Sequence, residues 1–124
     1  MVKKSDWKIV KEMPAETAKF TLEMNLNETD MNLIREGFRP KQMEDKWFIY
    51  FEDDTLYIHR SWTGYCRYTA IFLENGIVKV TVNRNPEQYN ETNIEIDKID
   101  FNILINGIIG RSSRELMMKY VKMK

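Results

Sequence analysis

The chain has 124 residues, with 19 basic and 19 acidic side chains, so its formal net charge is zero. A chain of this length suits one domain and can bury most of its apolar surface without disulfides. The balanced charge argues against a nucleic-acid binder that works by bulk electrostatics, because such proteins carry a basic excess. We therefore predict a single domain over residues 1–124 and expect no nucleic acid among its partners.

We expect neither an N-terminal signal peptide nor a membrane-spanning helix in this sequence. The opening MVKKSDWKIVKEM lacks the apolar run of a signal peptide. No stretch approaches the roughly 20 apolar residues that a membrane helix needs, so no membrane partner is expected. The only cysteine, Cys66, cannot form an internal disulfide, which favours a reducing compartment. These features predict a cytoplasmic protein.

Familiar catalytic and metal-binding motifs are absent from the sequence. One histidine and one cysteine cannot build a His/Cys zinc site. There is also no Gly-rich phosphate loop, no GxSxG elbow and no HExxH helix. We expect no metal and no cofactor, and we assign no catalytic residue.

The N-terminal third combines strand and helix signals. Every second residue from Phe20 to Leu26 is apolar, as in a half-buried strand, although Pro-Ala-Glu at 14–16 equally suits the start of a helix. We favour the strand. Residues 27–30, Asn-Glu-Thr-Asp, supply helix-capping side chains, and Gly37 is typical of a helix end. A short helix is therefore expected between them.

The middle of the chain is a run of β-structure. Asp53-Asp54 is a polar pair suited to a tight turn, and Asn75-Gly76 is the strongest short hairpin signal. The expected strands span residues 46–52, 55–60, 65–74 and 77–84. Four consecutive strands with short connections predict an antiparallel meander.

Two helices are expected near the C-terminus. The segments 92–95 and 112–115 each match the capping-box pattern, in which Ser or Thr and Glu satisfy free backbone donors. Gly107 and Gly110 mark the break between the helices. Strands followed by helices predict an α+β domain: an antiparallel sheet of four or more strands, with helices on one face, two of them C-terminal.

The turns also predict which residues pair and which face each occupies. The expected pairs are Phe51 with Leu56, Leu73 with Val78, Tyr57 with Tyr68 and His59 with Cys66. Alternation along the strands then sorts the sheet into two faces. The face expected to pack against helices carries Ile49, Phe51, Leu56, Ile58, Ile71, Leu73, Val78, Val80 and Val82. The other carries Phe48, Tyr50, Tyr57, His59, Cys66, Tyr68, Thr81 and Asn83.

This second face is rich in rings with polar tips. Such rings combine large apolar area with hydrogen-bonding groups, which is the make-up of a binding surface. In the alternative, the N-terminal segment covers the face as a second, wetter core layer, since aromatic residues also reflect β propensity. Both interpretations stay open at this point.

The loop at 59–64 is the sharper candidate for a site. Gly64 permits a close backbone approach, Arg60 offers a planar charged fork for an anion, and Trp62 offers a stacking plate for a base. Alternatively the loop is a structural corner in which Arg60 pairs with an acidic residue at 44–45. The candidate ligand-binding residues are His59, Arg60, Trp62, Tyr57, Tyr68, Glu44, Asp45 and Arg84.

The run MEDKWFIYFEDDTLYIHRSWTGYCRY, residues 43–68, resembles that of a small uncharacterised bacterial domain family. The likeness continues through VNRNPEQYNET into the following apolar segment, residues 82–105, and HRSWTG is its most specific part. Together these segments cover about half of the chain. Members are found with ADP-ribosylglycohydrolase-type proteins, so the resemblance implies an ADP-ribose-handling context. The aspartate-rich metal motifs of those hydrolases are absent, so the resemblance does not imply their activity.

The leading hypothesis is a non-enzymatic binding or accessory module with an aromatic/arginine site. Its ligand would be anionic, in particular a nucleotide or an ADP-ribose-like molecule. The first alternative is a small enzyme on such substrates, with His59 and Glu44 or Asp45 as acid–base groups. General-base catalysis by His59 would need a nucleophile such as Ser61 or Cys66 within hydrogen-bond reach, which nothing in the spacing demands. The second is a protein-interaction domain that presents an exposed aromatic sheet face to a partner.

Overall fold

In the computed structural model, which describes all residues from 1 to 124, the chain forms an antiparallel sheet with the strand order β1-β5-β4-β3-β2. The strands are β1 Thr17–Glu23, β2 Trp47–Glu52, β3 Thr55–Arg60, β4 Cys66–Phe72 and β5 Ile77–Asn83. The helices are α1 Glu28–Glu36, α2 Ile94–Ile109 and α3 Arg114–Met123, with a short 3-10 turn, η1, at Lys4–Asp6. The predicted α+β architecture is confirmed, and the favoured N-terminal strand is β1. None of the helices is long and apolar enough to cross a membrane.

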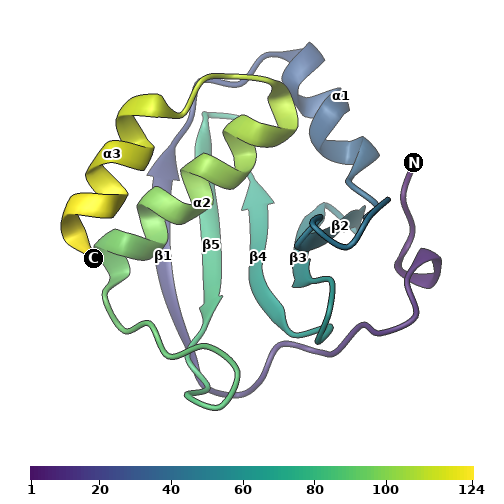
Figure 1. Cartoon of the computed structure of the whole chain (residues 1–124). Helices are drawn as coiled ribbons and strands as arrows, with labels where there is room; N and C mark the ends of the chain where they lie inside the picture. The colour runs from purple at the N-terminus through teal and green to yellow at the C-terminus, as the bar shows by residue number, and fades with distance from the viewer.

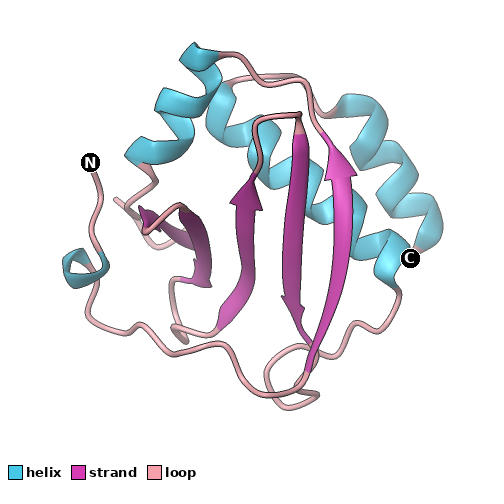
Figure 2. Cartoon of the chain, turned by 180° about the vertical axis from the view of Figure 1, so that it is seen from behind, coloured by secondary structure: helices cyan, strands magenta, loops and turns pink.

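One face of the sheet packs against helices. Helix α2 crosses in front of the strands in Figure 1 and behind them in Figure 2. Its Phe101 and Ile105 are fully buried with Ile58, Val80 and other strand residues in the main core. Helix α3 has no buried residue and contacts α2. The helix-packed face expected around Ile49, Ile58 and Val80 is therefore confirmed.

Helix α1 begins and ends as its sequence indicates. The Asn27 Oδ1 accepts a hydrogen bond from the Asp30 N–H at 2.8 Å, and the Asp30 carboxylate accepts from the Asn27 N–H at 3.1 Å. Gly37 ends the helix with φ +76°, and its N–H donates to the Ile34 carbonyl. A Cβ at Gly37 would lie 2.3 Å from the Ile49 carbonyl oxygen, so only glycine fits here.

The two predicted C-terminal capping boxes are wrong in detail. The N-caps are Asn93 and Ser113, one residue later than expected, and the Asn93 Oδ1 accepts from the Glu95 N–H. The Glu91 carboxylate already accepts from the backbone N–H of residue 92, which removes the donor that the box would satisfy. Gly107 lies inside α2, and only Gly110 ends that helix.

The pairing of β4 with β5 differs from the prediction by one residue. The Gly76 N–H donates to the Leu73 carbonyl and the Leu73 N–H donates to the Ile77 carbonyl, so the loop holds three residues. Gly76 has φ +82°, as in three-residue hairpins that place glycine in the left-handed region. Phe72, rather than Leu73, therefore pairs with Val78.

A bulge in β4 produces the second difference. His59 pairs with Cys66 as expected, but Ile58 pairs with Tyr68, so Arg67 is an extra residue in the ladder. Tyr57 consequently pairs with Thr69, and the predicted pair with Tyr68 is wrong. The shift turns Tyr68 toward the helices, where it is fully buried in the main core. It also removes Ile71 and Leu73 from the predicted helix-facing set, leaving both exposed.

The other face is covered in part by residues 7–13, which we call the strap. The Trp7 ring stacks on Phe48 with centroids 5.8 Å apart, and the Lys11 N–H donates to the Gly64 carbonyl. Phe48, Tyr50 and His59 are each no more than 3% exposed. The structure therefore has the alternative arrangement, in which the N-terminal segment covers part of the aromatic face.

Candidate functional site

The eight candidate residues lie in three places rather than around one point. Some lie in the loops before β2 and after β3, some beneath the strap, and some on the helix side of the sheet. The three groups are Trp62, Glu44 and Asp45; Tyr57 and His59; and Arg60, Tyr68 and Arg84. The arginine and tryptophan that were expected to act together belong to different groups, because one ends a strand and the other lies in the turn beyond it.

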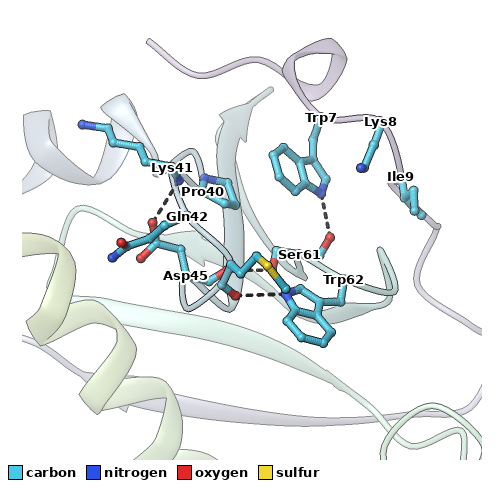
Figure 3. Close-up of a pocket in the computed structure, with 10 residues that line it drawn as sticks. Trp7, Lys8, Ile9, Pro40, Lys41, Gln42, Asp45, Ser61 and Trp62 are labelled. Carbon is cyan, nitrogen blue, oxygen red and sulfur yellow. Dashed lines mark hydrogen bonds between the residues drawn. The ribbon is translucent and has the colours of Figure 1, made fainter.

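Two members of the loop group, Trp62 and Asp45 but not Glu44, line a cavity of about 560 Å³, which we call the Trp62 pocket. It lies between the strap, the loop at 40–45 and the turn at 61–62, and Figure 3 shows Trp7 and Trp62 on either side of Ser61. Trp62 is 63% exposed, yet its Nε1 donates a hydrogen bond to the Met43 carbonyl at 3.1 Å. The indole is therefore held in place while its surface stays open.

Hydrogen bonds to Ser61 fix the walls of the Trp62 pocket. The Trp7 Nε1 donates to the Ser61 carbonyl at 2.8 Å, and the Ser61 Oγ donates to the Asp45 carbonyl at 2.8 Å. The Asp45 carboxylate accepts from the Lys41 N–H at 2.9 Å, which closes its own loop. Asp45 thus shapes the pocket wall, whereas Glu44 is exposed and makes no hydrogen bond or ion pair.

The charge of the Trp62 pocket comes mainly from two lysines. Lys8 and Lys41 line it, and both are exposed. The one carboxylate in the lining, that of Asp45, already accepts a backbone hydrogen bond. The lining thus combines two tryptophan rings with a small positive excess of charge, although the Lys41 side chain extends away from the rings in Figure 3.

The helix-side group does not contain the ion pair that the corner interpretation predicted. Arg60 makes no contact with Glu44 or Asp45; its guanidinium carbon lies 4.8 Å from the centre of the Trp47 ring. The expected pair is wrong because Arg60 projects to the helix side of the sheet, whereas the 44–45 segment lies in the loop before β2.

Arg84 and Tyr68 are held by two aspartates of α2. Arg84 forms an ion pair with the fully buried Asp97. The Tyr68 hydroxyl donates to the Asp100 carboxylate at 2.6 Å. Burial raises the pKa of the Asp100 carboxyl above its usual range, and the Tyr68 hydrogen bond opposes that shift. Burial also raises the pKa of the Tyr68 hydroxyl, which therefore stays protonated and remains a donor.

Beneath the strap, three rings lie nearly parallel. Tyr50 stacks on Tyr57 at 4.8 Å and on His59 at 5.6 Å. The His59 Nδ1 lies 3.0 Å from the Gly64 carbonyl oxygen, to which it donates, and the buried Nε2 has no partner. Burial lowers the pKa of the His59 imidazole, so the neutral ring is favoured.

No nucleophile accompanies this histidine. Neither Ser61 nor Cys66 hydrogen-bonds to His59, and the Cys66 Sγ instead lies 3.6 Å from the Tyr68 carbonyl oxygen. Burial raises the pKa of the Cys66 thiol to about 12, which disfavours a thiolate. The chain also has no group of three or more His, Cys, Asp or Glu side chains placed to hold a metal ion.

Sequence reasoning missed several residues that the structure brings to these places. Trp7 and Lys8 line the Trp62 pocket because the strap folds back over the sheet end. Arg67 reaches the helix side because of the bulge, beside Trp47. No local sequence signal predicts the bulge at Arg67. By contrast, the isolated tryptophan at position 7 was a signal that the N-terminal segment packs against the rest of the domain.

No known protein family matches the chain, and no curated protein or solved structure matches it either. The likeness to the MEDKWFIY and HRSWTG family therefore stays a prediction.

Proposed function

We propose that the protein is a non-enzymatic binding module whose Trp62 pocket takes an anionic ligand with a planar ring, such as a nucleotide or an ADP-ribose-like molecule. One observation carries this proposal. The Trp62 indole, 63% exposed, is fixed by its hydrogen bond to Met43 beside a cavity of about 560 Å³. Concave sites lined by aromatic side chains with a few polar groups are the usual places for small ligands.

A fixed indole favours binding for an energetic reason. Immobilising a free side chain on binding costs about 0.5–1.5 kcal/mol, and the hydrogen bond to Met43 removes much of that cost in advance. Stacking of a base on an aromatic side chain contributes about 1–3 kcal/mol. Trp7, on the other wall, is held by its own hydrogen bond to Ser61, so both rings are in place before a ligand arrives.

Two lysines support an anionic ligand. Lys8 and Lys41 line the pocket and outnumber its one carboxylate, that of Asp45, although the Lys41 side chain extends away from the two indoles in Figure 3. The arginine part of the sequence hypothesis does not belong to this pocket, because Arg60 lies on Trp47. In this proposal the two lysines take the anion-binding role that was expected of Arg60.

Neither alternative function has a comparable observation behind it. An enzyme that used His59 to activate Ser61 or Cys66 would need one of them hydrogen-bonded to the imidazole, and neither is. A partner protein on the aromatic sheet face would need exposed rings, but Phe48 and Tyr50 are buried under the strap.

The test is a calorimetric titration of ADP-ribose, AMP and NAD into the wild-type protein, Trp62→Ala and Lys8→Ala. We expect saturable binding that Trp62→Ala weakens at least tenfold and Lys8→Ala weakens less. Val121→Ala, at an exposed apolar position of α3, is the matched control and should bind like wild type. Binding no tighter than about 1 mM, near −4 kcal/mol, or full affinity in Trp62→Ala, would refute the proposal.

A further inference from the structure

Two arginines on the helix side of the sheet end have no polar partner in the protein. Arg60 and Arg67 are both half-buried, and neither guanidinium makes a hydrogen bond or an ion pair. Each guanidinium carries five N–H donors. Arg84, which lies in the same region, shows the ordinary arrangement because it pairs with Asp97. Among the half-buried arginines of this protein, Arg60 and Arg67 are the ones without a polar partner, since Arg35 and Arg84 each form an ion pair.

Aromatic rings fix both groups. The Arg60 guanidinium carbon lies 4.8 Å from the centre of the Trp47 ring, and that of Arg67 lies 5.4 Å from the same centre. Arg67 also lies 3.6 Å from the centre of the Tyr89 ring. These cation–π contacts hold the guanidinium groups without using their N–H donors, which make no hydrogen bond within the protein.

The free N–H groups reach the surface. The only fully buried side-chain nitrogen or oxygen without a partner anywhere in the protein is the His59 Nε2. The guanidinium nitrogens of Arg60 and Arg67 are therefore accessible to water or to a ligand. Two like charges beside one indole repel each other, so this arrangement has an electrostatic cost that an anion would relieve.

Nearby carboxylates neutralise the two arginines only in part, because Asp100 is the one acidic group whose charge acts on both Arg60 and Arg67. Asp97 is engaged by Arg84 and by the Tyr89 hydroxyl, which donates to it at 2.8 Å. Asp100 accepts from Tyr68 and forms no ion pair. Even with Asp100 ionised, the cluster of three arginines and two aspartates keeps a positive excess.

The bulge in β4 is what brings the second guanidinium to this place. Arg67 is the extra residue between the pairs His59–Cys66 and Ile58–Tyr68. Bulges re-aim a side chain that regular alternation would direct elsewhere. Arg67 thereby meets Trp47 on the side of the sheet that Arg60 also occupies.

We propose that Arg60 and Arg67, held by Trp47 and Tyr89, form a second binding site, separate from the Trp62 pocket, for the phosphate group of a small molecule. Two guanidinium forks match a dianionic oxyanion better than a single carboxylate, because each fork can donate two parallel hydrogen bonds to it. Free phosphate and a phosphate monoester share this chemistry.

The test uses inorganic phosphate, glycerol 3-phosphate and acetate as probes at constant ionic strength, with binding followed by calorimetry and by amide chemical shifts of residues 47, 60 and 67. We expect saturable binding of the phosphate probes, weak or absent binding of acetate, and shifts centred on those three residues. The phosphate probe that binds more tightly shows whether the site prefers free phosphate or a phosphate monoester.

Variants complete the test. Arg60→Gln and Arg67→Gln should each weaken phosphate binding at least tenfold, and Arg67→Lys should weaken it less because it keeps the charge. Arg114→Gln, at an exposed arginine without aromatic support, is the matched control. Thermal melts establish that each variant is folded, and two independent positions keep the test decisive if one is not.

The result that would overturn this site is equal weakening by Arg114→Gln, or no saturation by phosphate below about 10 mM, roughly −2.7 kcal/mol. Trp62→Ala should leave phosphate binding unchanged. The second site and the Trp62 pocket can therefore fail independently.

Discussion

The Arg67 guanidinium lies on the ring of Tyr89, with 3.6 Å between its carbon and the ring centre. The contact joins the bulge of β4 to the loop that precedes α2. The Tyr89 hydroxyl in turn donates to Asp97 at 2.8 Å, and Asp97 pairs with Arg84. One chain of contacts therefore ties the bulge, the end of β5 and the start of α2 together, and the first prediction concerns its buried carboxylate.

Asp97→Asn should destabilise the protein by about 3 kcal/mol, because it leaves Arg84 with a half-buried, unpaired charge. Urea unfolding measures the loss. Glu44→Gln, at an exposed acidic residue without a partner, should change stability by less than about 0.5 kcal/mol. Similar losses in the two variants would mean that the Asp97 pair does not stabilise the fold.

Asp45→Asn provides a second comparison for the same measurement. Its carboxylate accepts only the exposed Lys41 N–H, so the expected loss is no more than about 1 kcal/mol. A loss of several kcal/mol would instead restore the idea that the 44–45 segment is a structural anchor.

Stability should fall as the pH falls below about 6.5, the usual pKa of histidine. Burial lowers the pKa of His59 in the folded state, and the charge of Lys4 adds to this, while the hydrogen bond to Gly64 opposes it. As the pH falls, His59 therefore becomes protonated in the unfolded chain at a higher pH than in the folded protein. The stabilisation that is present above about pH 6.5 is lost as the pH falls from there to the lower pKa of the folded state.

The measurement is urea unfolding at pH 7.5 and pH 5.5 for wild type and His59→Gln. The wild type should lose at most about 1.4 kcal/mol per pH unit in this window, the limit for one proton. His59→Gln is less stable at both pH values, but its stability should change less between them. Identical slopes would assign the pH dependence to other groups.

Gly64→Ala should release the strap. Gly64 has φ +77°, and a Cβ there would lie 2.5 Å from the Ile9 Cγ2 and 2.6 Å from its carbonyl oxygen. Gly110 has the same φ, but a Cβ there would have no atom within 4 Å, so Gly110→Ala is the matched control for backbone strain alone. Left-handed strain costs about 1–2 kcal/mol in both variants.

The difference between these two variants isolates the contact with the strap. Hydrogen exchange of the Lys11 N–H, which donates to the Gly64 carbonyl, should become faster in Gly64→Ala and stay slow in Gly110→Ala. Equal protection in both would show that the strap is held elsewhere.

Local patterns predicted most of the fold but not the division of the site. Alternation and turn residues located every strand, and the pair of Phe51 with Leu56 was predicted correctly because the turn at Asp53-Asp54 has its ordinary two residues. The bulge at Arg67 and the three-residue loop before Ile77 each insert one residue. The bulge reverses the face of the later β4 side chains, which is why Tyr68 was placed on the wrong side, and the extra loop residue restores the predicted face in β5.

The site was harder to predict because it depends on contacts between distant segments. Trp62 was identified from its residue type, but its partner wall comes from Trp7, far away in the sequence. Arg60 was identified too, yet its companion Arg67 depends on the bulge. Residue type can thus indicate a candidate, while the residues beside it follow only from tertiary packing.

The last prediction compares Trp7 with Trp62. Trp7→Ala removes the stacked contact with Phe48 and the hydrogen bond to Ser61, so it should cost about 2–3 kcal/mol, below the 3–5 kcal/mol of a fully buried tryptophan because Trp7 is only half-buried. Trp62→Ala removes an exposed ring and should cost less than about 1 kcal/mol. Loss of Trp7 should also expose the rings beneath the strap, so a dye that fluoresces on apolar surfaces should bind to Trp7→Ala and not to Trp62→Ala. If the two variants were equally stable and neither bound the dye, the strap would not be what keeps the aromatic face covered, and that face would again be a candidate surface for a protein partner.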